Sequence, residues 1–160
     1  MKTIIITGTP GTGKTIIAKK LAKKINYEYI DVNEIIKKNK LNNKYLKKFD
    51  TYEVDEKKLN TLLIKIIKNS KNNLVIDSHL SHYLNKKYVD LCIVTKCNIK
   101  ELKKRLNKRK YSKIKIRENL DAEIFDVCLV EAKENKHKIL IVDTTKKKVD
   151  ECLREIIKKS

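Results

Sequence analysis

Eight residues near the amino terminus have the types and the spacing that hold phosphate groups. From Gly8 to Thr15 they read Gly-Thr-Pro-Gly-Thr-Gly-Lys-Thr, which matches the pattern G-x-x-x-x-G-K-[ST]. Glycines let backbone N–H groups turn inward and approach phosphate oxygens closely, and the positive end of a following helix adds to the attraction. We expect Lys14 to reach the β- and γ-phosphates and the Thr15 hydroxyl to ligate Mg²⁺. The segment therefore predicts a site for a nucleoside triphosphate, and we interpret the ligand as ATP.

The distribution of glycine and proline strengthens this interpretation. The chain has 160 residues, of which three are glycine and one is proline, and all four lie within this octapeptide. At average residue usage the pattern arises by chance in well under about one chain in a hundred. A β-branched run precedes the octapeptide and a helical pattern follows it, as a phosphate-binding loop requires. Every other turn of the chain must use Asn, Asp, Ser or Lys.

Three further side chains are candidates for the same chemistry. Asp77 ends the apolar run 74–77, and in open α/β sheets ligands bind at the carboxyl ends of strands, where a carboxylate can hold Mg²⁺. His79 could orient a phosphate or a water molecule, or position Asp77, and a purely structural role is equally open. Arg109 lies at a break between helical patterns, where it could stabilise a transferring phosphoryl group; the alternative is a solvated helix end.

The hydrophobic pattern alternates between strands and helices. Short apolar runs predict strands at 2–7, 27–31, 74–77, 91–94 and 139–142. Periodic apolar positions predict helices at about 14–25, 33–40, 55–69, 98–108, 113–135 and 146–158. The segment 41–55 is expected to be irregular. This alternation favours an α/β fold with a parallel sheet covered by helices on both faces, in a single domain that spans residues 1–160.

The composition bounds the possible partners and the compartment. The net charge is +19, and nearly all of the positive charge comes from Lys. The lysines are spread along the whole chain, which favours a solvated layer of lysines on the outer faces of the helices. The alternative is that they bind a polyanion such as RNA. The four cysteines form no C-x-x-C pair, the histidines are scattered, and Cys92 and Cys128 are expected to pack as small hydrophobes. No apolar run approaches the roughly 18 residues of a membrane span, and the start lacks a signal-peptide layout. We expect a soluble, cytoplasmic protein that is a monomer by default.

Four segments beyond the phosphate loop resemble a known family. They are Tyr29-Ile-Asp-Val-Asn33, Val75-Ile-Asp-Ser-His79, Arg109-Lys-Tyr111 and Asn119-Leu-Asp-Ala-Glu-Ile-Phe125. Together with the loop, and over nearly the whole chain, they resemble the adenylate kinase isoenzyme 6 family. These are atypical adenylate kinases of nuclei and archaea, also called coilin-interacting nuclear ATPases. Many kinases share the loop, whereas the D-x-H and N-x-x-A-E-I-F segments are much more specific.

The resemblance implies an adenylate-kinase-like P-loop NTPase fold in three layers, with strand order 2-3-1-4-5 along the chain. It implies a monophosphate-binding region at about 31–54 and a lid at about 108–118. The implied activity is a Mg²⁺-dependent ATP:AMP phosphotransferase that also hydrolyses ATP. A role in small ribosomal subunit and rRNA maturation, through a platform ribosomal protein, is implied as well.

Site residues carry over by motif. The implied ATP-binding residues are Gly11, Thr12, Gly13, Lys14, Thr15, Ile16 and Arg109. Catalysis would involve Lys14, Asp77, His79 and Arg109, and the metal would be held by Thr15 and Asp77.

One departure concerns the acceptor. Adenylate kinases commonly carry an arginine on the first helix of the monophosphate region, but this chain has none before Arg105. Asn33 and Lys37 are the candidates for AMP binding, and Lys lacks the bidentate fork of Arg. We therefore expect weaker AMP binding and relatively more ATP hydrolysis. Two alternatives stay open: an ATP-driven assembly factor whose client is a protein or rRNA, and another small-molecule kinase, for shikimate, dephospho-coenzyme A or a nucleoside, which the lack of an arginine-rich acid pocket disfavours.

Overall fold

Five parallel strands form the central sheet of the computed structural model, which describes residues 1–159. They are β1 (Thr3–Thr7), β2 (Glu28–Asp31), β5 (Leu74–Asp77), β6 (Leu91–Lys96) and β7 (Ile139–Asp143). Their order is β2-β5-β1-β6-β7, and every neighbouring pair is parallel. Counted along the chain without the hairpin described below, this is the order 2-3-1-4-5, so the predicted topology is confirmed. Both faces of β1 and β5 are buried, which explains their continuous apolar runs.

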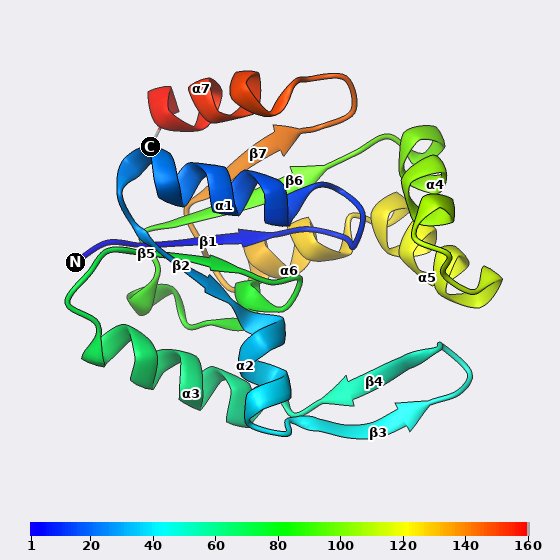
Figure 1. The fold of residues 1–160 in the computed structure, drawn as a ribbon, viewed down its shortest axis with the longest axis horizontal. Coiled ribbons are helices and arrows are strands. Elements are labelled where there is room, and N and C mark those ends of the chain that lie inside the picture. Colours follow the sequence, from blue (N-terminus) through cyan, green and yellow to red (C-terminus); the bar gives the residue numbers. More distant parts are fainter. Residues whose placement is uncertain (160) are drawn as a thin grey trace.

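Helices cover both faces of this sheet (Figure 1). They are α1 (Lys14–Ile25), α2 (Val32–Lys38), α3 (Glu56–Asn69), α4 (Ile99–Lys108), α5 (Lys113–Ile124), α6 (Val127–Glu134) and α7 (Val149–Lys159), with the 3₁₀ turns η1 (Ser81–Tyr83) and η2 (Lys86–Tyr88). One apolar cluster joins β1 through Ile4 and Ile6 to α1 and α7. The other joins Ile5 to α2, α3 and α6. Successive residues of a strand point to opposite faces, so the run of isoleucines in β1 stabilises both layers.

The segment 41–55 is not irregular, and that prediction is wrong. It forms an antiparallel hairpin of β3 (Asn42–Leu46) and β4 (Thr51–Val54), which projects from the body of the molecule in Figure 1. The strands are mostly exposed, so they carry no apolar alternation that a sequence pattern could reveal. The rings of Tyr45 and Tyr52 lie 5.1 Å apart across the pair, and this cross-strand contact stabilises the hairpin.

The single helix predicted at 113–135 is wrong. The structure has two helices there, α5 (Lys113–Ile124) and α6 (Val127–Glu134). The chain breaks between α5 and α6, where Asp126 adopts a left-handed conformation with φ 54°. Lys96 contacts the carboxylate of Asp126 and also forms an ion pair with Glu123. Ile124, one of the periodic apolar positions of this segment, is 55% exposed. The break thus lies at a left-handed residue paired with a lysine that is distant in the sequence, and helical periodicity does not reveal such a contact.

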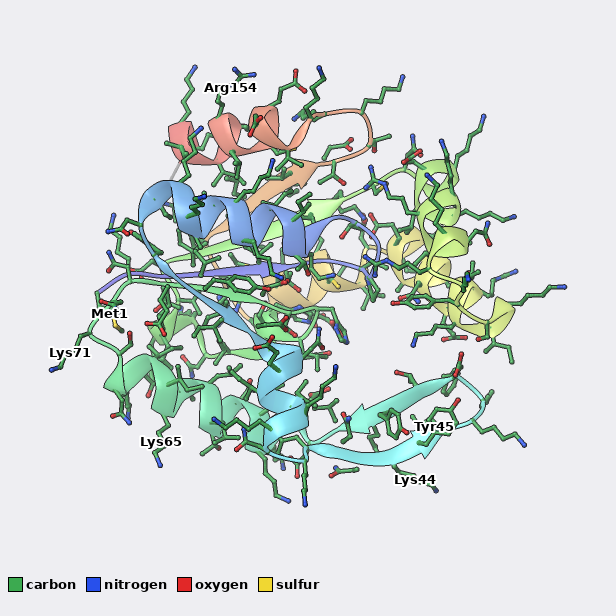
Figure 2. The ribbon with its side chains drawn as sticks, viewed as in Figure 1. Met1, Lys44, Tyr45, Lys65, Lys71 and Arg154 are labelled. Carbon is green, nitrogen blue, oxygen red and sulfur yellow. The ribbon has the colours of Figure 1, made fainter. Side chains whose placement is uncertain are left out.

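Most of the lysines lie on the outside, as a solvated layer requires, and Lys14 is the buried exception. Lys44, Lys65 and Lys71 are exposed, and Figure 2 shows their side chains pointing away from the body of the molecule. Within residues 1–159 no helix has the length and the apolar character needed to cross a bilayer. Cys92 is buried in the core as expected, whereas Cys128 is only half-buried and lines the cleft described below.

Candidate active site

The phosphate loop leaves the carboxyl end of β1 at the centre of the sheet and leads directly into α1. Two of its glycines have no substitute. A Cβ on Gly8, at φ 139°, would lie 2.4 Å from Thr95 Oγ1, and a Cβ on Gly11, at φ 96°, would lie 2.8 Å from Leu102 Cδ1. Neither the backbone conformation nor the available space tolerates a side chain. The glycines therefore allow the loop to pack tightly against β6 and α4.

Threonine side chains hold the loop in shape from behind. Thr12 Oγ1 donates to the backbone oxygen of Thr9 over 2.7 Å, and Thr144 Oγ1 donates to the backbone oxygen of Thr12 over 2.6 Å. Thr9 Oγ1 donates to Glu123 Oε2 over 2.6 Å. The Thr12 side chain is fully buried, so it supports the loop from inside the protein. These bonds set the loop geometry within the protein itself, which reduces the reorganisation needed when a ligand binds.

A cleft of about 940 Å³ lies between the loop, the start of α2, the end of β5, the hairpin, the end of α4 and the helices α5 and α6. Of the predicted site residues, the following line it: Gly11, Gly13, Lys14, Thr15, Ile16, Asn33, Asp77, His79 and Arg109. Its size is suitable for a nucleotide-sized ligand. The fold thus brings predicted residues from four separate segments of the sequence to one hollow, and Thr12 and Lys37 are the predicted residues that do not line it.

Lys14 is the buried charge of the cleft. Its side chain is only 9% exposed, and Nζ donates to the backbone oxygen of Thr9 over 3.3 Å. Burial lowers the pKa of Lys14 to about 8, although the nearby Asp77 carboxylate acts in the opposite direction. Phosphate oxygens would supply the partners that this ammonium group lacks, so the site is electrostatically prepared for an anion.

Asp77 and Thr15 are the groups that could hold a magnesium ion. Asp77 is 3% exposed at the end of β5, and its Oδ2 accepts from Tyr29 Oη over 3.1 Å. Among residues 1–159 no hydrogen bond reaches its Oδ1, and the Thr15 side chain is exposed to the cleft. One free carboxylate oxygen and one hydroxyl suit Mg²⁺, which keeps several waters and takes few protein ligands. The described chain contains no cluster of three His, Cys, Asp or Glu that could hold another metal.

His79 and Arg109 both line the cleft, from the segment after β5 and from the end of α4. His79 is exposed to the cleft solvent, yet the surrounding walls displace water from it and Lys14 adds positive charge, so the pKa of His79 falls to about 4. Arg109 is exposed, caps the end of α4 and donates to Tyr111 Oη over 3.4 Å. The cleft is therefore lined by a neutral imidazole and by an exposed guanidinium.

A second hollow of about 430 Å³ continues from the first. The two share Gly11, Gly13, Ile16 and Arg109 in their linings, and the second extends to Arg105 and to the loop between β7 and α7. Arg105 donates to both the hydroxyl and the backbone oxygen of Thr144, so it holds that loop against α4. A ligand bound on the phosphate loop could thus extend from one hollow into the other.

The side of the cleft formed by α2 and the hairpin is less basic than the side formed by the phosphate loop. Asn33 lies at the start of α2 and lines the cleft together with Phe49 and Thr51 of the hairpin. Lys37 lies one turn further along α2, is exposed and does not contribute to the lining. No arginine of the described chain extends to this side from α2 or the hairpin. An anion bound here would depend on groups other than Lys37, or on a movement that brings Lys37 inward.

Sequence reasoning missed the side chains that hold the site in place. Glu123 contacts the phosphate loop, Tyr29 contacts Asp77, and the buried His82 bridges Thr7 Oγ1 (2.7 Å) and Glu131 Oε2 (2.8 Å) beneath the cleft. Glu123 and Tyr29 both occur in the segments that carry the family resemblance, so those motifs could have marked the two residues as candidates. Their chemistry depends on contacts between residues 48 and 114 positions apart, which no local pattern reveals.

This chain is similar to several known proteins. A family model described as "AAA domain" matches residues 4–126. A protein of Methanocaldococcus jannaschii named "Putative adenylate kinase" is 42% identical over 154 residues, which cover 96% of this chain and 83% of that protein. A protein of the same name from Methanosarcina barkeri is 40% identical over 96% of this chain and 82% of its own length.

A solved structure shows the same fold at low sequence identity. The shikimate kinase of Bacteroides thetaiotaomicron superposes with a TM-score of 0.63 over 99% of this chain and 97% of its own, at 15% identity. At that identity the likeness concerns the fold alone. With relatives near 40% identity along almost its entire length, and with a phosphate loop at the centre of a five-stranded parallel sheet, this chain belongs to the adenylate kinase-like family of P-loop proteins.

Proposed function

We propose that this protein is a Mg²⁺-dependent ATP:AMP phosphotransferase that also hydrolyses ATP. The observation that carries the proposal is the convergence of Lys14, Asp77 and Arg109 on one cleft beside a preorganised phosphate loop. Phosphoryl transfer needs little covalent chemistry from a protein, because positioning and charge stabilisation supply most of the catalysis. The names of the archaeal relatives support adenosine nucleotides as the substrates.

In this proposal ATP is the donor. Backbone N–H groups from Gly11 to Ile16 and the ammonium group of Lys14 bind its phosphates, while Thr12 holds the loop from inside. The nucleoside extends into the second hollow, between Arg109 and the loop that follows β7. The monophosphate-binding region at about 31–54 and the lid at about 108–118 form the other two walls of the cleft.

Thr15 and Asp77 would hold Mg²⁺, which when bound neutralises and orients the phosphate oxygens. Lys14 and Arg109 place positive charge on two sides of the transferring group, where negative charge spreads over its oxygens. His79 is neutral at physiological pH, so it orients the attacking water or acceptor oxygen by a hydrogen bond and adds no charge.

The acceptor is AMP in the first instance and water in the second. Asn33 and Lys37 are the proposed AMP-binding residues, but Lys37 lies outside the cleft lining, and this observation favours a substantial ATPase activity. A bidentate arginine would hold the AMP phosphate more firmly than these groups can. We therefore expect a weak acceptor site, and ATP hydrolysis when AMP is absent.

The finer family assignment is also part of the proposal. The D-x-H and N-x-x-A-E-I-F segments support membership of the isoenzyme 6 family, with a role in small ribosomal subunit maturation, a platform ribosomal protein as partner and a cytoplasmic location. The net charge of +19 is compatible with an RNA contact. Co-purification with a small-subunit protein that ATP releases would support this role, and a lack of any ATP-dependent partner would count against it.

A nucleotide panel tests the catalytic proposal. ADP formation and phosphate release are measured with ATP alone and with ATP plus AMP, CMP, GMP or UMP, with and without Mg²⁺. We expect ADP from ATP and AMP only when Mg²⁺ is present. If ATP is hydrolysed but no monophosphate increases ADP formation, the phosphotransferase proposal is wrong and the ATPase stands alone.

A further inference from the structure

Helix α5 is attached to the body of the protein through a buried carboxylate. All residues of α5 are described, and Glu123 is the only one of them that is buried. Two apolar residues of the helix, Ile116 and Leu120, pack instead against the cluster that contains Leu102 and Leu106 of α4. This small cluster is separate from the two cores of the sheet. Helices α4 and α5 thus form a unit of their own, and Figure 1 shows the pair beside the end of the phosphate loop.

Both carboxylate oxygens of Glu123 accept hydrogen bonds, one from the phosphate loop and one from the segment that leads into α4. Oε2 accepts from Thr9 Oγ1 of the loop over 2.6 Å, and Oε1 accepts from the backbone N–H of Cys97 over 3.0 Å. Lys96 Nζ lies 3.0 Å from Oε1 and balances the charge. Cys97 lies between β6 and α4. One side chain therefore connects α5, the phosphate loop and the start of α4.

The same helix pair carries the groups that close the cleft. Arg109 ends α4, and Tyr111, Lys115 and Asn119 line the cleft from the turn and from α5. Gly11 of the loop packs directly against α4, since a Cβ there would lie 2.8 Å from a Leu102 methyl group. A displacement of the helix pair would therefore disturb the packing of Gly11 in the phosphate loop.

We propose that Glu123 is a positioning residue that couples the helix pair α4–α5 to the phosphate loop through Thr9. This inference rests on the proposed phosphoryl-transfer function. Glu123 does not touch the nucleotide; it acts by fixing Thr9, and thereby the backbone N–H groups that hold the phosphates, relative to Arg109. Its loss misaligns the two sides of the transferring phosphoryl group while leaving the binding groups in place.

The test uses isosteric changes at both ends of the link. Thr9→Val removes the hydroxyl at constant shape, Thr9→Ser keeps it, and Glu123→Gln keeps the shape but can no longer accept at both oxygens. We expect Thr9→Val and Glu123→Gln each to lower kcat about tenfold to a hundredfold with KM for ATP within about threefold, because small misplacements reduce rate more than affinity. Thr9→Ser restores kcat. Asp126→Asn is the matched control, since it removes the other carboxylate that contacts Lys96 and leaves the link intact.

The double variant separates coupling from general damage. If the two residues act through one link, Thr9→Val combined with Glu123→Gln is no slower than the worse single variant. Multiplying effects, equal losses in Asp126→Asn, or a failure of Thr9→Ser to rescue would overturn the proposal. Thermal melting of each variant identifies unfolding, and a loss of kcat that follows the melting temperature counts as structural damage and against coupling.

Amide hydrogen exchange tests the link independently of turnover. With a non-hydrolysable ATP analogue and Mg²⁺, nucleotide on the loop should protect both the segment 8–15 and the segment 97–112 in the wild type. In Thr9→Val we expect protection of 8–15 alone. Protection of both segments in that variant contradicts the coupling. A wild type that shows both protections but no phosphoryl transfer refutes the proposed function and leaves the coupling standing.

Discussion

Lys14 should make nucleotide binding depend on pH in a range where an ordinary lysine does not titrate. Burial lowers its pKa from 10.5 to about 8 in the free protein, because the charged form has lost water without gaining a full set of partners. A bound triphosphate supplies those partners and raises the pKa of Lys14 again. Binding is therefore linked to proton uptake by Lys14, and affinity is complete below pH 8 and declines as the pH rises above it.

The size of the change in affinity and of the proton uptake follows from the Lys14 pKa of about 8. Lys14 in the free protein is charged to roughly nine-tenths at pH 7, one-half at pH 8 and one-tenth at pH 9, so binding should take up about 0.1, 0.5 and 0.9 protons respectively. The dissociation constant should rise about twofold by pH 8 and about tenfold by pH 9 relative to its low-pH value. The last pKa of the phosphates lies at about 6, so they are roughly nine-tenths ionised at pH 7 and almost fully ionised at pH 8 and 9, where the effect of Lys14 is largest.

Isothermal titration of a non-hydrolysable ATP analogue, with Mg²⁺ and in two buffers of different ionisation enthalpy, measures both quantities at pH 7, 8 and 9. Lys14→Arg is the matched control, since a guanidinium keeps its charge at every one of these pH values; its affinity should not vary with pH. Lys14→Met should bind weakly and take up no proton. A wild type whose affinity stays constant up to pH 9 without proton uptake would refute the reasoning, as would an unchanged pH dependence in Lys14→Met.

Four further predictions concern single side chains. Asp77→Asn should lower Mg²⁺-dependent turnover by roughly a hundredfold or more while the affinity for ATP without Mg²⁺ changes little, because it weakens a metal ligand; turnover assays over a Mg²⁺ series check this. Lys37→Ala should raise KM for AMP a fewfold if Lys37 moves inward to hold the acceptor phosphate, whereas the neighbouring exposed Lys38→Ala should not; equal effects would remove Lys37 from the site. Lys96→Met should cost roughly 1 to 3 kcal/mol of unfolding free energy in denaturant titrations, because it leaves the Glu123 carboxylate buried with fewer donors. Leu63→Ala, which opens a cavity beside α3 at a fully buried position, should cost about 2 to 5 kcal/mol in the same assay without changing KM for ATP.

Local sequence patterns predicted the phosphate loop and the buried strands, because in each of them a single physical requirement restricts the residue types. A loop that wraps phosphates must be glycine-rich, and in this chain Gly8 to Thr15 leaves no other interpretation. Strands buried on both faces must be continuously apolar, so β1 and β5 were visible as short runs. The remaining left-handed turns do use Asn, Asp and Lys, at Asn26, Lys40, Asp50, Lys110, Asp126 and Lys136. The strand order came from the family resemblance, since periodicity alone does not order a sheet.

The hairpin β3–β4 and the break at Asp126 were not predictable in the same way. An exposed hairpin is stabilised by backbone pairing and by a contact such as that of Tyr45 with Tyr52, and neither imposes an apolar period. At the helix break, Asp126 contacts Lys96, which lies 30 residues earlier in the chain. Propensity acts over a few residues, whereas such ion pairs act only once the chain has folded.

By itself, the sequence determined the chemistry at the centre of the cleft: the loop, the carboxylate of Asp77 at a strand end and the scarce Arg109 are each visible as residue types in position. Only the tertiary structure decided which side chains position these groups and which predicted residue does not line the cleft. It placed Glu123 against Thr9 and Tyr29 against Asp77, and it left Lys37 outside the cleft lining. The physical reason is that a backbone loop binds phosphate through local conformation, whereas the alignment of donor, metal and acceptor depends on side chains brought together from distant parts of the chain.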